Sequence, residues 1–365
     1  MADDLVLRLN KAYASCPKTI TWLRPAHPAA VFAELSAACA EFGIDEWDTY
    51  AEHGAIERLE QEVKALLGKP AAAYFPSGIM AQQAALRVHS ERAGSVRVAL
   101  PDLSHLLVHE EDGPRIVQHL RMEHLTQGAQ APTAAHLEAI PGLLAAVLVE
   151  LPLRDAGCLL PTFDELAELS ARCHERGVAL HIDGARIWES VDYLGRGLAE
   201  IAALADTVYV SFYKGLGGLA GSVLLGAEDV LAEARLWRRR MGGTIYRNTA
   251  EAVSALAGLR RRLPLMAACA RWARSFAAAL PAGITVSPSV PHTNQFFVFA
   301  PGDPDLINSR LLAHAEANGV ALGGPWRSTA EPGRATAELN IGDGALALDP
   351  GEIAGIVGEL VTPSG

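Results

Sequence analysis

Two segments of the chain end predicted strands in residues that could do chemistry. In HIDGARIW (181–188), Asp183 ends a strand and is followed by a glycine turn and Arg186. In SFYKGLGGLAGS (211–222), Lys214 stands before four glycines, which can adopt positive φ and let the backbone approach a ligand. Ligands of open α/β sheets bind at the carboxyl ends of strands. Taken singly, Asp183 is equally well explained as a turn residue that caps the next helix, while an ordinary glycine-rich turn is the less favoured alternative for the second segment.

A third segment, FPSGIMAQQ (75–83), places Ser77 and Gly78 between a predicted strand and a helix. A helix start of this kind offers free N–H groups and a hydroxyl to a phosphate, although capping by Ser77 alone is the plainer interpretation. The three segments together meet the needs of pyridoxal 5'-phosphate. Its phosphate needs an anchor, its ring nitrogen a carboxylate such as Asp183, and its aldehyde a lysine such as Lys214, which follows 31 residues later.

The glycine-rich segment also has a superficial likeness to a dinucleotide-binding fingerprint. That fingerprint requires a helix after the glycines, whereas SVLLG (222–226) has the pattern of a strand. The order of residues of a phosphate-binding loop of nucleoside triphosphatases is missing as well. A nicotinamide-dependent oxidoreductase is therefore disfavoured.

The elements around these segments alternate between strand and helix. Apolar runs of strand type and helical patterns follow one another, and this alternation predicts an α/β fold with a mostly parallel sheet. The strands are predicted at 71–76, 143–151, 178–183, 207–212 and 222–226, and the helices at 55–67, 79–92, 163–177 and 227–240.

A helix-rich stretch at 249–280 leads to a different pattern, in which strands and helices of a smaller α+β domain follow. We therefore predict an N-terminal arm at 1–50, a cofactor-binding large domain at 51–254 and a small C-terminal domain at 255–365.

Composition limits the classes of function. The 365 residues are 50% hydrophobic and 20% charged, which excludes a mainly disordered chain. A net charge of −11 disfavours general binding to nucleic acid or anionic membranes, so the basic cluster RLWRRR (235–240) is interpreted as a solvated face or an interface. Five scattered cysteines, an acidic start without an apolar core, and no apolar run of about 18 residues predict a cytoplasmic protein.

The sequence resembles the threonine aldolases and β-eliminating lyases, which are pyridoxal-phosphate enzymes of the aspartate-aminotransferase-like fold (fold type I). The matching stretches are IERLEQEVKALLGKPAAAYFPSGIMA, HIDGARIW, KGLGGLAGS and WRRRMGGTIYRN, in this order over roughly residues 55–260. The resemblance implies an aspartate-aminotransferase-like large domain and a small amino-acid substrate. It also implies a homodimer or homotetramer with active sites at the subunit interface.

The resemblance also implies roles for single residues. Lys214 resembles the Schiff-base lysine, and Asp183 the carboxylate that faces the pyridine nitrogen. Arg186 resembles the arginine that binds the substrate carboxylate, since its planar fork suits bidentate pairing. Ser77 and Gly78 match the phosphate-binding turn.

Further positions match less closely. Ile79 stands where the family commonly has a threonine, so only its backbone N–H can serve the phosphate, and Ser211 is a candidate to compensate. His105 falls where the family has a histidine stacked on the cofactor ring, with a structural loop histidine as the alternative. Arg247 resembles an arginine that serves the cofactor near the dimer interface.

The segments that bind the substrate in this family have different sequences in this chain. LVLRLNKAYAS replaces the family's LRSDT-like stretch, and ELPLRDAG (150–157) replaces a THN-like segment, so that Arg154 becomes a candidate substrate-binding residue where a histidine is usual. Only Arg334 lies near the position of a C-terminal family arginine. His105 and His109 have the i, i+4 spacing of metal ligands but lack a third ligand, so no metal is expected.

These observations predict a lyase that cleaves the Cα–Cβ bond of a threonine-like β-hydroxy-α-amino acid. The alternatives are β-elimination or another lyase reaction on the same cofactor, and a non-catalytic cofactor-binding protein. The catalytic residues are expected to be Lys214, Asp183 and His105, while the base for the hydroxyl stays open between His105, a water and a phosphate oxygen of the cofactor.

Overall fold

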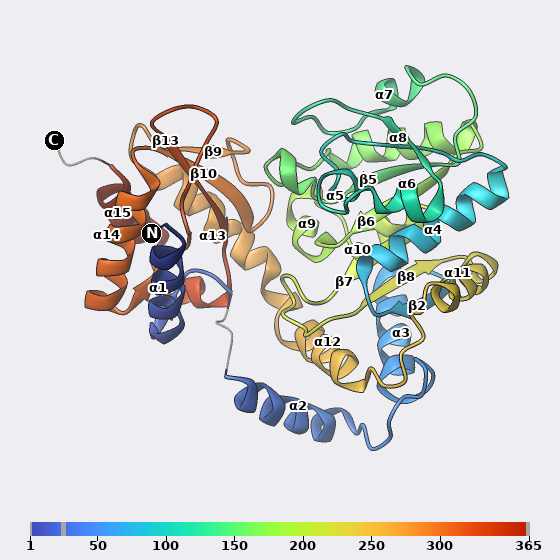
Figure 1. The fold of residues 1–365 in the computed structure, drawn as a ribbon, viewed down its shortest axis with the longest axis horizontal. Helices are drawn as coiled ribbons and strands as arrows, with labels where there is room; N and C mark the ends of the chain where they lie inside the picture. The colour runs from blue at the N-terminus through green and yellow to red at the C-terminus, as the bar shows by residue number, and fades with distance from the viewer. Residues whose placement is uncertain (1, 23–26, 363–365) are drawn as a thin grey trace. The chain divides into compact units, whose positions relative to one another are not determined.

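The computed structural model describes residues 2–22 and 27–362, which form two compact units (Figure 1). The large unit comprises residues 32–263, and the small unit combines the chain up to Val31 with the chain from Pro264 onward.

A seven-stranded sheet forms the centre of the large unit, in the order β2-β8-β7-β6-β5-β3-β4. β8 runs antiparallel to both of its neighbours, while the other strands are parallel, so their carboxyl ends share one edge of the sheet. The mostly parallel sheet is as predicted. The strands are β2 (Ala71–Phe75), β3 (Arg97–Leu100), β4 (Arg121–His124), β5 (Ala146–Glu150), β6 (Ala179–Gly184), β7 (Thr207–Ser211) and β8 (Ser222–Gly226).

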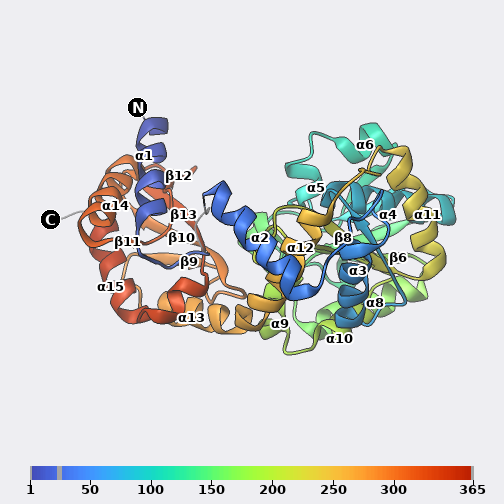
Figure 2. The ribbon, with the colours of Figure 1, turned by 90° about the horizontal axis from the view of Figure 1, so that it is seen from below.

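Helices cover both faces of this sheet. Figure 2 shows α4, α5, α6 and α11 on one face and α3, α8 and α10 on the other. The helices are α2 (Pro28–Phe42, which begins in the small unit), α3 (Gly54–Leu67), α4 (Gly78–Ala93), α5 (His105–Val108), α6 (Gly113–Gln118), α7 (Ala134–Glu138), η1 (Arg154–Ala156), α8 (Phe163–Glu175), α9 (Ile187–Leu194), α10 (Leu198–Ala203), α11 (Glu228–Arg240) and α12 (Thr249–Arg261).

Local sequence explains where these helices begin and end. α3 ends at Gly68, whose φ of 62° is the left-handed conformation that glycine adopts without strain. α8 begins with a capping box in which Thr162 and Glu165 bond each other's backbone N–H groups. α4 is buried on the sheet because alanines such as Ala81 and Ala84 allow a close approach to the strands.

The small unit has a four-stranded antiparallel sheet in the order β12-β13-β10-β9, and a parallel pair formed by β1 and β11. Phe276 and Phe296 lie in its core. Its elements are α1 (Ala2–Ser15), β1 (Lys18–Thr19), η2 (Leu263–Leu265, at the unit boundary), α13 (Met266–Ala279), β9 (Thr285–Ser287), β10 (Gln295–Pro301), α14 (Pro304–Asn318), β11 (Val320–Ala321), β12 (Arg327–Ser328), β13 (Arg334–Asn340), η3 (Asp343–Ala347) and α15 (Pro350–Val361).

The unit boundaries differ from those expected. The segment predicted as an arm at 1–50 is divided, because α1 buries Leu9 in the core of the small unit and β1 pairs with β11, whereas the chain from Phe32 belongs to the large unit. The second boundary lies after Leu263 rather than after residue 254, because α12 packs on α3 within the large unit.

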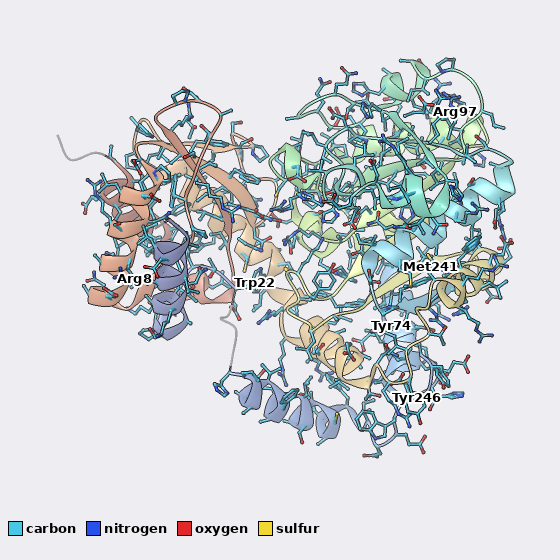
Figure 3. All side chains as sticks on the ribbon, viewed as in Figure 1. Arg8, Trp22, Tyr74, Arg97, Met241 and Tyr246 are labelled. Carbon is cyan, nitrogen blue, oxygen red and sulfur yellow. The ribbon has the colours of Figure 1, made fainter. Side chains whose placement is uncertain are left out.

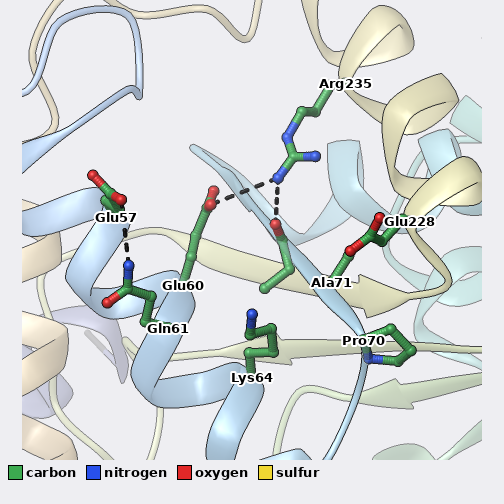
Figure 4. Close-up of a pocket in the computed structure, with 9 residues that line it drawn as sticks. Glu57, Glu60, Gln61, Lys64, Pro70, Ala71, Glu228 and Arg235 are labelled. Carbon is green, nitrogen blue, oxygen red and sulfur yellow. Dashed lines mark hydrogen bonds and ion pairs between the residues drawn. The ribbon is translucent and has the colours of Figure 1, made fainter.

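Side chains of α3 and α11 cover the outer edge of β2. The backbone N–H of Tyr74 donates to Glu60 at 2.7 Å, while Arg235 and Arg238 donate to the carbonyls of Ala72 and Tyr74. Glu60, Ala72 and Arg235 also line a surface groove of about 400 Å³ (Figure 4). This groove contains none of the predicted site residues.

Of the helices in residues 2–22 and 27–362, none combines the length and the apolar character that crossing a lipid bilayer requires.

Candidate active site

Two buried carboxylates lie side by side at the carboxyl edge of the sheet. Register pairs Asp183 of β6 with Glu150 of β5, and both are at most 5% exposed. Burial raises the pKa of both groups, the charge of Asp183 raises the pKa of Glu150 further, and the ammonium of Lys214 opposes both shifts. Asp183 accepts hydrogen bonds from the N–H of Ala185, at 3.0 Å, and from Gln82 of α4. These bonds hold the carboxylate of Asp183, which was predicted as a site residue, in a fixed orientation.

Lys214 follows β7 in a tight turn. The N–H of Gly217 donates to the carbonyl of Lys214 at 2.9 Å, and Gly217 has the positive φ, 69°, that its glycine permits. Burial lowers the pKa of the Lys214 ammonium, and Asp183 is the carboxylate that most strongly opposes this shift. A lowered pKa increases the fraction of neutral amine, which is the nucleophilic form.

The start of α4 fits a phosphate group. Ser77 is the N-cap but makes no capping bond with its side chain, and its hydroxyl and the N–H groups of Gly78 and Ile79 have no hydrogen-bond partner in the described part of the chain. A Cβ on Gly78 would lie 1.9 Å from the hydroxyl of Tyr209, so this close approach requires glycine. Three unused donors at the positive end of a helix are a suitable anion cradle.

The two remaining residues predicted for the phosphate region contribute differently. The side chain of Ile79 packs against an apolar cluster and offers no donor. Ser211 is buried at the end of β7, next to the hydroxyl of Tyr209, and its carbonyl accepts a hydrogen bond from the Trp188 indole at 2.9 Å.

Arg186 is held at the start of α9 with part of its fork unused. Its Nη1 donates to both carboxylate oxygens of Glu189, at 3.2 and 3.4 Å. Its Nε is buried and has no partner among residues 2–22 and 27–362. The positive charge of Arg186 lowers the pKa of Lys214, so the guanidinium lies in the same part of the site as the lysine. An arginine with such a donor can bind a substrate carboxylate.

His105 is the first residue of α5 and lies next to the carboxylate of Glu150. Its backbone N–H donates to Oε2 of Glu150 at 3.0 Å, and its Nδ1 lies 2.9 Å from Oε1 of Glu110. Burial and the nearby charge of Lys214 lower the pKa of His105 to about 4, so the ring is neutral at neutral pH. The stacking of His105 on a cofactor ring stays a prediction.

Arg154 lies in the same group of side chains. Its backbone N–H donates to Oε1 of Glu150 at 3.2 Å, and its Nη1 donates to Asp155 at 3.1 Å. Asp155 also bonds Nε2 of His109 at 2.8 Å, and the His109 ring lies 4.9 Å from that of His105. No group of three metal-ligating side chains occurs in the described residues, so the two histidines stay a pair.

Arg247 contacts a different part of the large unit. It donates to Thr49 at 2.7 Å and to the hydroxyl of Tyr246 at 3.2 Å, and its guanidinium lies over the rings of Trp47 and Tyr246. Figure 3 marks Tyr246, which is half exposed. Among the described residues, none of the hydrogen bonds or ion pairs of Arg247 is to Lys214, so its role at the cofactor stays a prediction.

Sequence reasoning missed several polar groups that the fold brings to this site. Glu150 could have been noticed, because it ends an apolar strand run in the same way as Asp183. Glu189, Glu110 and Asp155 carry no such signal, since they lie in helices or loops where acidic residues are common.

Comparison with known proteins identifies the family. Residues 29–302 match the beta-eliminating lyase family. Low-specificity L-threonine aldolase 1 of Arabidopsis thaliana is 29% identical over 281 residues, which are 73% of this chain and 77% of the relative.

Solved structures agree over nearly the full length. A candidate L-allo-threonine aldolase of Listeria monocytogenes is 34% identical, with a TM-score of 0.89 and coverage of 98% of this chain and 99% of that one. A candidate aromatic amino acid beta-eliminating lyase/threonine aldolase of Exiguobacterium is 32% identical, with a TM-score of 0.88 and coverage of 97% and 99%. The chain therefore belongs to the beta-eliminating lyase family, whose members use pyridoxal phosphate, and is a lyase of the threonine aldolase type.

Proposed function

We propose that this enzyme holds pyridoxal 5'-phosphate at Lys214 and cleaves the Cα–Cβ bond of a β-hydroxy-α-amino acid, which yields a smaller amino acid and an aldehyde. The observation that carries the proposal is that a half-buried lysine, Lys214, and the buried carboxylate of Asp183 shift each other's pKa by charge, at the strand edge where α4 presents unused N–H groups.

The residues divide the binding of the cofactor among them. Ser77 and the N–H groups of Gly78 and Ile79 would hold the phosphate, the carboxylate of Asp183 would accept a hydrogen bond from the protonated ring nitrogen, and the neutral ring of His105 would cover the heterocycle. When bound, pyridoxal phosphate supplies a sink for the electron pair of a bond that breaks at the amino-acid α-carbon.

The protein's own groups orient the substrate. Arg186 would bind the α-carboxylate through its free Nε, while Glu189 fixes the rest of the guanidinium. Lys214, whose pKa is lowered by burial, would take up and return a proton close to the α-carbon. Arg154 is proposed to contact the substrate side chain, because its loop is tied to Glu150 beside the site.

Borohydride reduction of the purified enzyme, followed by peptide mapping, tests where the cofactor is held. We expect the label on Lys214 and expect Lys214→Ala to lose both label and turnover while it stays folded. Lys69→Ala is the matched control, because Lys69 also has a pKa lowered by burial but lies at the carbonyl of Ala205. A label on another lysine, or none, would contradict the proposal.

Product analysis tests which bond breaks. Release of glycine and an aldehyde from threonine or phenylserine supports aldol cleavage, whereas release of pyruvate and ammonia from serine supports elimination. Cofactor binding without either product would indicate a non-catalytic protein.

We further propose that the enzyme is a cytoplasmic homodimer or homotetramer with active sites at the subunit interface. Half-exposed aromatic residues, namely Trp47, Tyr50 and Tyr246, lie together around Arg247 and offer a surface for a second copy. Such a copy would explain how Arg247 serves a cofactor. The five free cysteines are consistent with a reducing compartment. Analytical ultracentrifugation, with Tyr246→Asp as the variant, tests the assembly.

A further inference from the structure

One histidine–carboxylate pair beside the site has no part in the scheme above. His109 follows α5, Asp155 lies in η1, and 46 residues separate them, yet Nε2 of His109 lies 2.8 Å from Oδ2 of Asp155. The other carboxylate oxygen, Oδ1, accepts a hydrogen bond from Arg154 at 3.1 Å, so Asp155 is held from both sides.

These bonds determine which nitrogen of His109 is basic. A carboxylate only accepts hydrogen bonds, so Nε2 of His109 carries the proton and Nδ1 keeps its lone pair. Nδ1 has no hydrogen-bond partner in residues 2–22 and 27–362, and the side chain is 38% exposed. The ring is thus oriented and accessible, which are the requirements for a general base.

The pair is connected to the site on two sides. The rings of His109 and His105 lie 4.9 Å apart with an angle of 45° between them. The carboxylate of Glu150 binds the backbone N–H groups of both His105 and Arg154, so it ties the segment that carries His109 to the segment that carries Asp155.

We infer that His109 is the base that removes the proton of the substrate's β-hydroxyl, and that Asp155 is the residue that positions it. The inference rests on the proposed aldol cleavage. The O–H bond breaks and an N–H bond forms at Nδ1, the oxygen lone pair becomes the second bond of the aldehyde carbonyl, and the Cα–Cβ electron pair stays on the α-carbon. Asp155 stabilises the resulting imidazolium, and the exposed ring returns the proton to solvent.

His105 is less suited to this task. Its pKa is lowered to about 4, which makes it a weak base at neutral pH, and its Nδ1 is already close to Glu110. Around His109, the titratable and charged groups include Asp155, Arg154, His105 and Glu110.

The experiment compares His109→Asn with His174→Asn in the holoenzyme, because His174 is an exposed histidine of α8. Two reactions are measured: cleavage of threonine, and exchange of the α-proton of glycine with deuterated water, which needs Lys214 but has no hydroxyl to deprotonate. We expect His109→Asn to lower kcat for cleavage by about 10² to 10⁴ without loss of glycine exchange, and His174→Asn to change neither.

A second measurement does not depend on turnover. Nitrogen-15 spectra of the histidine rings are expected to show His109 protonated at Nε2, and Asp155→Asn to give a mixture of tautomers together with a smaller loss of kcat. Full cleavage by His109→Asn, equal loss of cleavage and exchange, or an unchanged tautomer in Asp155→Asn would each overturn the inference. If the unmodified enzyme exchanges glycine but cleaves no hydroxy amino acid, the proposed function itself fails.

Discussion

Two clusters of buried polar side chains contact the same helix, α4, at opposite ends of the sheet. At the carboxyl edge, Gln82 bonds Asp183. Seven residues further along α4, Nε2 of His89 lies 2.8 Å from the hydroxyl of Thr207, which lies 2.8 Å from Nδ1 of His181. Both clusters are almost completely shielded from solvent.

The clusters differ in how their polar groups are satisfied. At the amino edge, burial lowers the pKa of His89 to about 4 and that of His181 to about 3, so both rings are neutral and share one hydroxyl. At the carboxyl edge, Asp183, Glu150 and Lys214 keep ionisable groups whose pKa values are shifted by burial and by one another. Burial of polar groups therefore does not by itself indicate a site, whereas conflicting charges beside unused donors do.

The largest difference between the two clusters is expected in kcat, when one carboxylate at each edge of the sheet is replaced. We expect Asp183→Asn to lower kcat by about 10² to 10³. The neutral amide of asparagine would not stabilise the positive charge of a protonated ring nitrogen in the proposed cofactor. Asp206→Asn is the control at the amino edge, where Asp206 accepts the N–H of Leu180 at 2.8 Å, and it should leave kcat unchanged. Steady-state kinetics of both variants test this expectation. An equal loss of kcat in both variants would contradict the statement that only the carboxyl edge takes part in catalysis.

The buried groups at the two edges should make the free energy of unfolding change with pH in opposite directions. The pKa of Glu150 is raised from 4.5 in the folded protein, so its contribution to stability is complete below pH 4.5 and is lost as pH rises. The pKa values of His89 and His181 are lowered from 6.5, so their contribution is complete above pH 6.5 and is lost as pH falls.

Each such group changes the free energy of unfolding by about 1.4 kcal/mol per pH unit inside its own window. Urea unfolding of the cofactor-free protein across this range measures the effect. Glu150→Gln should reduce the loss on the alkaline side only, and His89→Gln should reduce the loss on the acid side only. If either variant flattens both sides, the two edges are not independent.

The smallest expected effect is that of Thr207→Val. Without the hydroxyl, the ring nitrogens of His89 and His181 that face Thr207 lose their hydrogen-bond partner, so the free energy of unfolding should fall by about 1 to 3 kcal/mol. We expect kcat to stay the same, since the change is confined to the amino edge. Thermal unfolding and kinetics on the same sample test both statements, and a lower kcat would show that the edges communicate through α4.

Strands that are mostly apolar could be predicted from sequence, while polar or alternating strands could not. β5, β6 and β7 are mostly apolar, with a few polar residues such as His181, because both of their faces are buried. β4 lies at the edge of the sheet and exposes Arg121 and His124, so its pattern does not differ from that of a loop. β3 begins with Arg97 and has only three buried residues, which is too short a signal.

Site residues, too, could be predicted only where a local sequence pattern marks them. Asp183 and Lys214 could be singled out because Asp183 lies at the end of one strand, Lys214 follows shortly after another, and each belongs to a motif of the family. The pairing of His109 with Asp155 joins positions 46 residues apart through two loops, and no local pattern specifies how loops meet. The division of residues 1–50 was unpredictable for a similar reason, since Leu9 finds its apolar partners in the C-terminal part of the chain.

The covered edge of β2 has a consequence for how the sheet can associate. An open strand edge is a template onto which a foreign strand can add, and such additions initiate aggregation. At β2 this template is obstructed, because Glu60, Arg235 and Arg238 already bind the N–H of Tyr74 and the carbonyls of Ala72 and Tyr74. The opposite edge, β4, relies on charge instead, with Glu123 paired to Arg121 at 3.0 Å, so loss of these charges would leave β4 as the side from which fibrillar growth begins.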